Sequence, residues 1–155
     1  MFEMLPVEDE RQILRLYALY CHYFNHGEAE AWADLFVPDG AFTRLNAGAV
    51  QHGNFGNPAG TTTGRDNLLA LSKGRRELFK CLVRHQQTDM VVTPGLDANH
   101  AVGQSFILVT DWRDGPGRLA AVGDCTAEFV RLADGWRFAR ITLSTLPRLT
   151  PDPKA

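Results

Sequence analysis

The order in which helical and strand patterns follow one another restricts the fold of this chain more than any other feature. Apolar residues recur at helical spacing through much of residues 7–81, whereas residues 83–146 divide into four long stretches typical of β-strands. Short turns containing glycine and aspartate separate these stretches, as at 94–97 and 133–135. Because short turns join antiparallel neighbours, this half of the chain predicts an antiparallel meander. Helices followed by such a sheet indicate an α+β domain.

The individual elements can be placed from periodicity and from residues that end helices. We predict helices over 7–25, 28–36 and 66–81, and strands over 41–45, 83–93, 101–112, 118–131 and 136–146. Pro38-Asp39-Gly40 is predicted to form a turn after the second helix. Residues 46–64 predict an irregular lid or mouth loop, and residues 147–155, with three prolines, an extended tail. One domain spanning residues 1–155 is expected.

Composition and charge exclude several classes of function. The formal net charge is −2, and the densest basic run, Gly74-Arg75-Arg76, is too sparse for a nucleic-acid surface. The three cysteines lack the spacing of a zinc site or a disulfide framework, which predicts reduced thiols and no bound metal. The chain does not open on a secretory signal pattern, and no apolar stretch approaches the roughly 20 residues of a membrane span. A cytoplasmic protein without nucleic-acid or membrane partners is expected.

One predicted strand is apolar on both faces. Phe106, Ile107, Leu108 and Val109 are consecutive, so neither face of this strand is suited to water. The helices of the chain can cover only one face of a curved sheet. A second copy on the outer face is the natural inference, and we expect a homo-oligomer, a dimer or a trimer. Coverage by a loop or by the C-terminal tail is the alternative.

Several motifs in a fixed order resemble one known family. They are Tyr20 to Glu28, Trp32 to Ala41, Gly64-Arg65-Asp66 before a leucine-rich helix, Arg84-His85, and Asp134-Gly135-Trp136. This order resembles SnoaL-like proteins of the nuclear-transport-factor-2-like superfamily over about residues 8–143. The resemblance implies a cystatin-like cone, in which three helices pack on a strongly curved antiparallel sheet around one internal pocket.

The resemblance also implies two classes of function. Scytalone dehydratase, bile-acid dehydratases, a dehydrochlorinase, ketosteroid-isomerase-like enzymes and polyketide cyclases are similar proteins. They imply a cofactor-independent lyase or isomerase that abstracts a proton from a small cyclic, largely apolar ligand of aromatic, polyketide or steroid type. The small subunits of ring-hydroxylating dioxygenases are similar too, so a non-catalytic ligand-binding module or structural subunit is the alternative. A fold alone does not decide between them.

The resemblance assigns roles to three residues. His85 matches the histidine that removes a proton in the dehydratase-like relatives, and Asn25 stands where they carry the partner aspartate. An amide can orient the imidazole but carries no charge to offset imidazolium; in the serine-protease triad the equivalent exchange lowers turnover by roughly 10⁴. Tyr20 is our choice of hydrogen-bond donor to a substrate oxygen. The alternatives are a histidine satisfied by a backbone carbonyl, a helix-end asparagine and a core tyrosine.

Other positions depart from the family pattern. The stretch Ser105–Ile107 contains nothing ionisable where relatives carry a second His or Asp, and the frequent arginine of the last strand falls on Ile141. Strand alternation places Asp89 on the face of His85, but about 13 Å away along the strand.

The remaining candidate residues are predicted to line the pocket. Phe24, Trp32 and Phe42 would form an apolar wall. Small residues alternate on one face of two strands: Gly103, Ser105 and Ile107 on one, Gly123 and Cys125 on the other. Small residues on a concave face leave room for a ligand, although they are equally consistent with tight helix–sheet packing.

Overall fold

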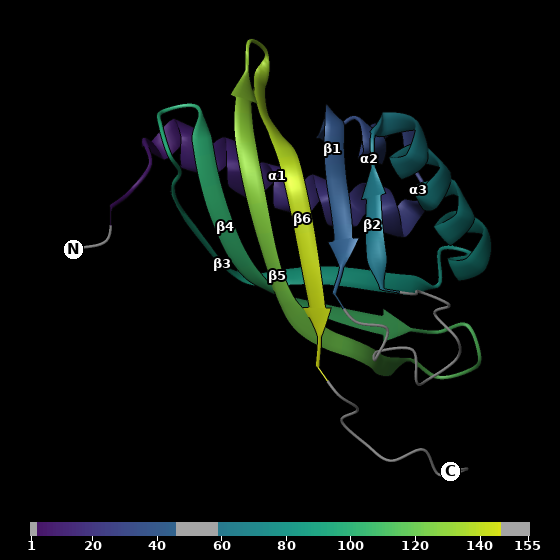
Figure 1. Ribbon diagram of the computed structural model, residues 1–155. Helices are drawn as coiled ribbons and strands as arrows, with labels where there is room; N and C mark the ends of the chain where they lie inside the picture. The colour runs from purple at the N-terminus through teal and green to yellow at the C-terminus, as the bar shows by residue number, and fades with distance from the viewer. Residues whose placement is uncertain (1–2, 46–58, 147–155) are drawn as a thin grey trace.

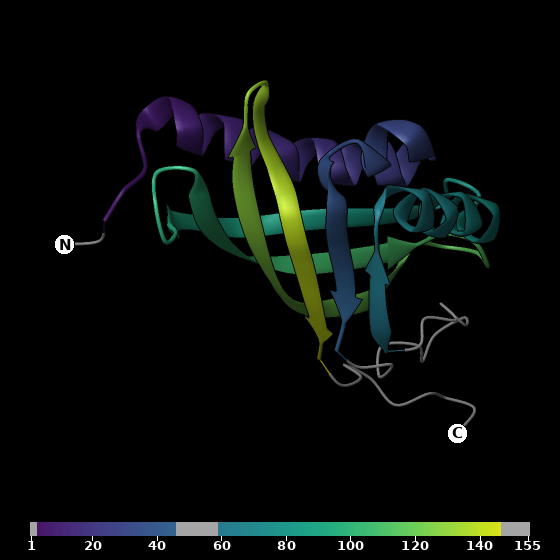
Figure 2. The same ribbon diagram turned by 45° about the horizontal axis from the view of Figure 1, so that its top comes forward.

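The long first helix lies across a strongly curved sheet, and the two other helices lie at one end of it (Figures 1 and 2). The computed structural model describes residues 3–45 and 59–146. The elements follow in the order α1 (Val7–His26), α2 (Ala29–Ala33), β1 (Phe36–Arg44), β2 (Gly60–Thr63), α3 (Arg65–Phe79), β3 (Val83–Pro94), β4 (His100–Asp111), β5 (Arg118–Leu132) and β6 (Gly135–Thr145). The predicted α+β cone is confirmed. No helix within these two stretches is long and apolar enough to cross a membrane.

Six strands form one sheet in the order β2-β1-β6-β5-β4-β3. Strands β3 to β6 form the antiparallel meander that the short turns predict. The pairing of β1 with β6 is parallel, which the sequence did not indicate. About a hundred residues separate these two strands, so their pairing is decided by packing of the whole domain rather than by a local turn signal.

Aromatic side chains fill the space between α1 and the sheet. Tyr17 is fully buried, and its ring meets those of Phe129 and Phe138 edge to face, with centroids 5.5 and 5.8 Å apart. Such pairs add about 0.5–1.5 kcal/mol to the stabilisation from burial. Tyr20, one turn further along α1, contacts Phe138 and Trp32. This part of the cone is therefore solid core.

The end of α1 is fixed at Gly27, as its sequence indicates. Gly27 has the left-handed φ of 71°, and the N–H of Glu28 donates to the carbonyl of Tyr23 at 2.9 Å. A side chain at Gly27 would also collide with Arg76 of α3, whose carbon atoms lie 2.6 Å from the position of a Cβ. Glycine is therefore required both by the left-handed backbone and by the approach of α3. Asn25 is consequently held in the last turn of α1.

The region after α1 corrects three expectations. Helix α2 ends at Ala33, and Phe36 begins β1 instead of ending the helix. Residues 38–40 lie within β1 rather than in a turn before it. The pairing of β1 with β6 explains this difference. Phe36 pairs with Phe138 and Ala41 pairs with Arg140, so β1 advances by more residues than β6 between these two pairs. Three extra residues of β1 form an irregularity in the strand, where proline needs no ladder partner.

The predicted loop 46–64 is wrong at its C-terminal end. Residues 60–63 form β2, which pairs antiparallel with β1 from Ala41 to Arg44. The β-branched Thr61, Thr62 and Thr63 favour a strand, a signal that the neighbouring glycines obscured. The rest of the predicted loop, 46–58, and the predicted tail, 147–155, lie outside the described residues.

The two faces of β4 differ in exposure. Ile107 and Val109 are buried, whereas Phe106 on the opposite face is 50% exposed. Val91 and Val102 share this outer face with Phe106 and are also exposed. The single chain therefore leaves several large apolar side chains of the outer face in contact with solvent.

Candidate functional site

His85 and Asn25 are joined by three hydrogen bonds between β3 and the last turn of α1. The backbone N–H of His85 donates to Asn25 Oδ1 at 2.8 Å, and Asn25 Nδ2 donates to the carbonyl of His85 at 2.9 Å. The third contact is between His85 Nδ1 and Asn25 Oδ1, at 3.0 Å. One amide thus binds the backbone and the ring of the same residue.

These contacts determine which ring nitrogen carries the proton. The backbone N–H of His85 can only donate and its carbonyl can only accept, so they fix which end of the Asn25 amide is oxygen. That oxygen faces Nδ1 and can only accept. A neutral His85 therefore carries its proton on Nδ1, and the lone pair is on Nε2. The two backbone contacts hold the Asn25 amide in place, and its oxygen in turn orients the imidazole of His85.

His85 lies in the wall of a cavity of about 260 Å³. Tyr20, Phe24, Trp32 and Phe42, which the sequence analysis selected, line the same cavity. The ring of Phe24 meets that of His85 edge to face at 5.0 Å, and the ring of Phe79 lies 5.6 Å from it. The imidazole is therefore partly buried between two aromatic rings. Asn25 contacts His85 but lines a second cavity, of about 370 Å³, between α1 and β3, which also includes His85.

Tyr20 keeps its phenolic proton in this environment. The residue is 1% exposed, and its ring stacks on Phe24 with centroids 6.1 Å apart. Burial raises the pKa of Tyr20 well above its usual value, and the nearby Cys125 and Cys21 thiols add to the rise. A neutral phenol at the cavity wall is a hydrogen-bond donor at any physiological pH.

Two arginines of this cavity were missed by the sequence analysis. Arg44, at the end of β1, and Arg75, on α3, both line it. Burial and the charge of Arg44 lower the pKa of Arg75 to about 10. Strand alternation could have identified Arg44, which shares a face with Phe42, and helical spacing could have identified Arg75, four residues before the buried Phe79. In both cases the sequence places an arginine among apolar residues on one face of an element, and this pattern could have indicated a charged group in the cavity.

The same surroundings keep His85 neutral. Burial, together with the smaller effect of the positive charges of Arg44 and Arg75, lowers its pKa to about 3. At neutral pH the imidazole therefore carries a lone pair rather than a charge. It is therefore a weak base, and Asn25 supplies no negative charge to stabilise imidazolium.

Five small or aliphatic residues were also predicted to line the pocket. Gly103, Ser105, Ile107, Gly123 and Cys125 line neither of the two cavities at His85. A Cβ at Gly103 would collide with the Tyr17 hydroxyl, and one at Gly123 with the backbone of Ser144. Small residues here allow close packing, which was the alternative.

Ser105 and Cys125 take part in a buried polar contact with β3. The Ser105 hydroxyl donates to Gln87 Oε1, and Gln87 Nε2 donates to Cys125 Sγ at 3.6 Å. Ile107 is 2% exposed, in the core. These residues hold β3, β4 and β5 together two residues beyond His85, and they do not contribute to the cavity.

Asp89 does not share the face of His85. The pairing of β3 with β4 shifts register between Thr88 and Val91, and Asp89 has a φ of 51° and is exposed. A bulge in an edge strand breaks the alternation on which the expectation rested. Among residues 3–45 and 59–146 no group of three or more His, Cys, Asp or Glu side chains could hold a metal.

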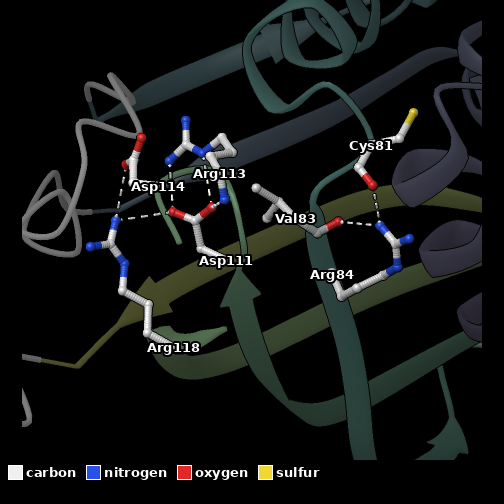
Figure 3. A network of polar contacts seen from close by, with 7 residues as sticks. All are labelled: Cys81, Val83, Arg84, Asp111, Arg113, Asp114 and Arg118. Carbon is white, nitrogen blue, oxygen red and sulfur yellow. Dashed lines mark hydrogen bonds and ion pairs between the residues drawn. The ribbon is translucent and has the colours of Figure 1, made fainter. Parts of the chain in front are cut away.

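A buried ion pair supports the cavity wall from outside (Figure 3). Arg113 donates to both oxygens of Asp111 at 3.0 Å, and its guanidinium lies 5.5 Å from the centre of the Phe79 ring. Burial alone would raise the pKa of Asp111, but the hydrogen bonds and charge of Arg113, together with Arg118, lower it to about 2. Phe79 in turn lines the cavity beside His85.

The start of β3 is held by the residue before His85. Arg84 donates from one nitrogen to the carbonyls of Cys81 and Val83, at 2.6 and 3.1 Å (Figure 3). Lys80 and Cys81 have left-handed φ values of 50° and 55° and reverse the chain between α3 and β3. This turn places His85 opposite the end of α1.

A helix-covered curved sheet with an internal cavity defines the class of cystatin-like, NTF2-like domains. Residues 6–142 match the SnoaL-like domain family, and the chain belongs to it. This family includes polyketide cyclases and scytalone-dehydratase-like enzymes. A comparison with curated proteins found no match.

Solved structures of similar proteins share the fold. An NTF2-like protein with a cystatin-like fold from Novosphingobium aromaticivorans has a TM-score of 0.76 and 24% identity, over 96% of this chain and 87% of that one. A Mycobacterium tuberculosis protein of unknown function has a TM-score of 0.76 and 25% identity, over 97% and 83%. A candidate scytalone dehydratase from Novosphingobium aromaticivorans has a TM-score of 0.72 and 19% identity, over 94% and 97%.

Proposed function

We propose that this protein is a cofactor-independent lyase or isomerase acting on a small cyclic, largely apolar molecule, with His85 as general base. The observation that carries the proposal is the double backbone anchor of Asn25, which fixes Nδ1 as the protonated nitrogen and leaves the Nε2 lone pair available. A general base requires a defined tautomer and position before it requires a matched pKa. Both are built into the fold here.

In the proposed reaction, His85 Nε2 accepts a proton from a carbon next to a carbonyl group. The electron pair of the broken C–H bond moves onto the carbonyl oxygen, which becomes an enolate. Imidazolium then returns the proton either to another carbon, which completes an isomerisation, or to a departing β-hydroxyl, which leaves as water. Either route restores neutral His85, and no oxidant or cofactor is needed.

Tyr20 and Asn25 would assist this step differently. The neutral phenol of Tyr20 can donate a hydrogen bond to the developing enolate oxygen, where such a donor contributes most. Asn25 holds the ring by accepting from Nδ1, in place of the negative charge of a carboxylate. We therefore expect slower turnover than an aspartate at this position would support.

Deuterium exchange tests the proposal without knowledge of the natural substrate. The purified protein is incubated in D2O with a panel of cyclic ketones and β-hydroxy ketones, and exchange or loss of water is followed by NMR. We expect His85→Asn to reduce the rate on the order of 10²-fold or more. His100→Asn is the matched control, because His100 lies at the start of β4 and lines neither cavity at His85, and it should keep the wild-type rate. Equal rates in wild type and His85→Asn would contradict the proposal.

The second candidate is a non-catalytic module that holds an apolar ligand or serves as a structural subunit. It is favoured by a specific observation: burial and two arginines lower the pKa of His85 to about 3, which makes it a weak base. Ligand binding by His85→Ala separates the two candidates. A binding module keeps most of its affinity and shows no turnover with any member of the panel, whereas an enzyme loses turnover that the wild type shows.

A further inference from the structure

We propose that the cavity beside His85 binds an anionic ring compound, a carboxylate or an equivalent delocalised oxyanion. Its charge lies at Arg44 and Arg75, and its ring lies against the aromatic wall. The inference rests on the proposed function for the location of the ligand and adds the charge that the ligand must carry. It keeps the largely apolar ring that the sequence predicted and adds one charged group to it.

The charge of the cavity wall is of one sign. Arg44 enters from β1 and Arg75 from α3, and no Asp or Glu is among the described residues that line the cavity. The two guanidinium groups are close enough for the charge of Arg44 to disfavour that of Arg75, in addition to the effect of burial. An anion between them would offset both costs, since guanidinium groups bind planar oxyanions through paired hydrogen bonds.

The rest of the wall suits a flat ring. Phe24, Trp32, Phe42 and Phe79 line the same cavity as the two arginines. Its volume of about 260 Å³ lies below the roughly 300–1,000 Å³ of typical pockets for larger ligands, which indicates a compound of one or two rings.

Trp32 provides a spectroscopic probe of the same cavity. The residue is fully buried, and its indole N–H has no hydrogen-bond partner among the residues that the structure describes. An unpaired buried donor costs about 1–3 kcal/mol. Because this N–H is enclosed and Trp32 lines the cavity, its resonance reports on the packing of the cavity wall.

Binding of an anion would also change His85. Arg44 and Arg75 are the charged groups that lower the pKa of His85 in addition to burial, and Tyr20 is the remaining titratable group of the same cavity wall. An anion that neutralises the arginines raises the pKa of His85 toward its ordinary value. The substrate would thereby strengthen the base that acts on it, which accounts for a site without a carboxylate partner.

A pair of probes of equal shape tests the charge directly. Naphthoate and naphthamide are titrated into protein labelled with 15N, and the indole N–H resonances are followed. We expect naphthoate to bind on the order of tenfold tighter or more, because hydrogen bonds to a charged group are stronger than those to a neutral one. Trp32 should shift, whereas Trp136, whose N–H already donates to Asp9 at 3.1 Å, should not.

Three variants locate the charge preference. Arg44→Met and Arg75→Met should each reduce the preference for naphthoate toward equality, and Arg44→Lys should retain part of it. Arg76→Met is the control, because Arg76 is the exposed neighbour of Arg75 on α3, and it should keep the wild-type preference. If the methionine variants fail to fold, the charge preference is tested instead by adding salt to the wild-type protein. Raising salt from about 0.02 to 0.5 M should weaken naphthoate binding and leave naphthamide binding unchanged.

Equal affinity for the two probes, or the same loss in Arg76→Met as in Arg75→Met, would overturn the inference. A shift of Trp136 without a shift of Trp32 would do so as well. The outcome is separable from that of the proposed function. Naphthoate preference retained in His85→Ala, with no turnover by the wild type, would refute the catalytic role alone. His85-dependent turnover confined to neutral ketones would refute the anion site alone.

Discussion

At the scale of single residues, the site depends on a neutral histidine held by an amide. Asn25 binds both backbone groups of His85 and its ring, so the amide controls position and tautomer together. The aromatic rings of Phe24 and Phe79 and the two arginines then disfavour the charged form of the imidazole.

The lowered pKa of His85 has a consequence for stability that depends on pH. In the unfolded chain this histidine takes up a proton near its ordinary pKa of 6.5, whereas in the folded protein it does so only near 3. Between these values the unfolded state binds more protons, so the free energy of unfolding falls as the pH falls. We expect a loss on the order of 1 kcal/mol for each pH unit below about 6.5.

Denaturant unfolding of wild type and His85→Gln between pH 7.5 and about 5 measures this loss. The variant should show a flatter dependence on pH than the wild type. Parallel curves for wild type and His85→Gln would show that His85 titrates normally.

Part of the candidate site around His85 could be predicted from the sequence. The sequence selected His85, Asn25, Tyr20 and the aromatic wall, and the structure brings them together around His85. It did not indicate Arg44 and Arg75, because an arginine in an amphipathic element is normally assigned to the solvent-facing side. It also placed small residues in the wall, but Tyr17 fills the space at Gly103 and the Ser144 backbone fills the space at Gly123, and neither contact could be read from the sequence.

At the scale of elements, the junction between α3 and β3 is held by a buried carboxylate. Asp111 at the end of β4 is 2% exposed and pairs with Arg113 and Arg118. Removing one partner of such a buried pair leaves the other charges uncompensated. Because Arg113 lies over Phe79, the effect would extend to the cavity wall.

We expect Asp111→Ala to lower the free energy of unfolding by about 3–5 kcal/mol. Asp114→Ala is the control, since Asp114 is 69% exposed and pairs with Arg118 at 3.6 Å; its effect should stay within about 0.5 kcal/mol. Chemical denaturation measures both. A small change in the free energy of unfolding for Asp111→Ala would show that the ion pairs of Asp111 contribute little to stability.

The long elements were predictable and the short ones were not. Helix α1 and strands β3 to β6 carry strong periodicity and clear turns, and their observed ends lie within one or two residues of those expected. The irregular β1 and the four-residue β2 depend on pairing with distant segments. Pro38 and Gly40 are typical of a turn when only the local sequence is considered. In the folded chain they belong to β1, because β1 pairs with β6 on both sides of them.

At the scale of the whole molecule, the outer sheet face remains without a partner in the single chain. Val91, Val102, Phe106 and Leu119 expose 58, 39, 50 and 42% of their surface on this face. Antiparallel sheets can face water on one side, but their outward residues are then mostly polar. A second copy of the chain on this face stays our prediction.

Light scattering after gel filtration measures the oligomeric state. We expect the wild type to exceed the monomer mass of 17.2 kDa and Phe106→Glu to reduce the mass to that of the monomer, because a buried charge without a partner disfavours the interface. Leu96→Glu is the control, since Leu96 is 83% exposed in the turn between β3 and β4. A monomeric wild type would refute the prediction.

The protonation state of His85 is the property on which the proposed site depends: the ring should be neutral, with its proton on Nδ1 and its lone pair on Nε2. Long-range 15N–1H correlation spectra of the imidazole at neutral pH measure this directly, because protonated and unprotonated ring nitrogens have different chemical shifts. We predict a protonated Nδ1 and an unprotonated Nε2 for His85 from neutral pH down to well below its ordinary pKa of 6.5. A proton on Nε2, or an imidazolium at neutral pH, would contradict the account.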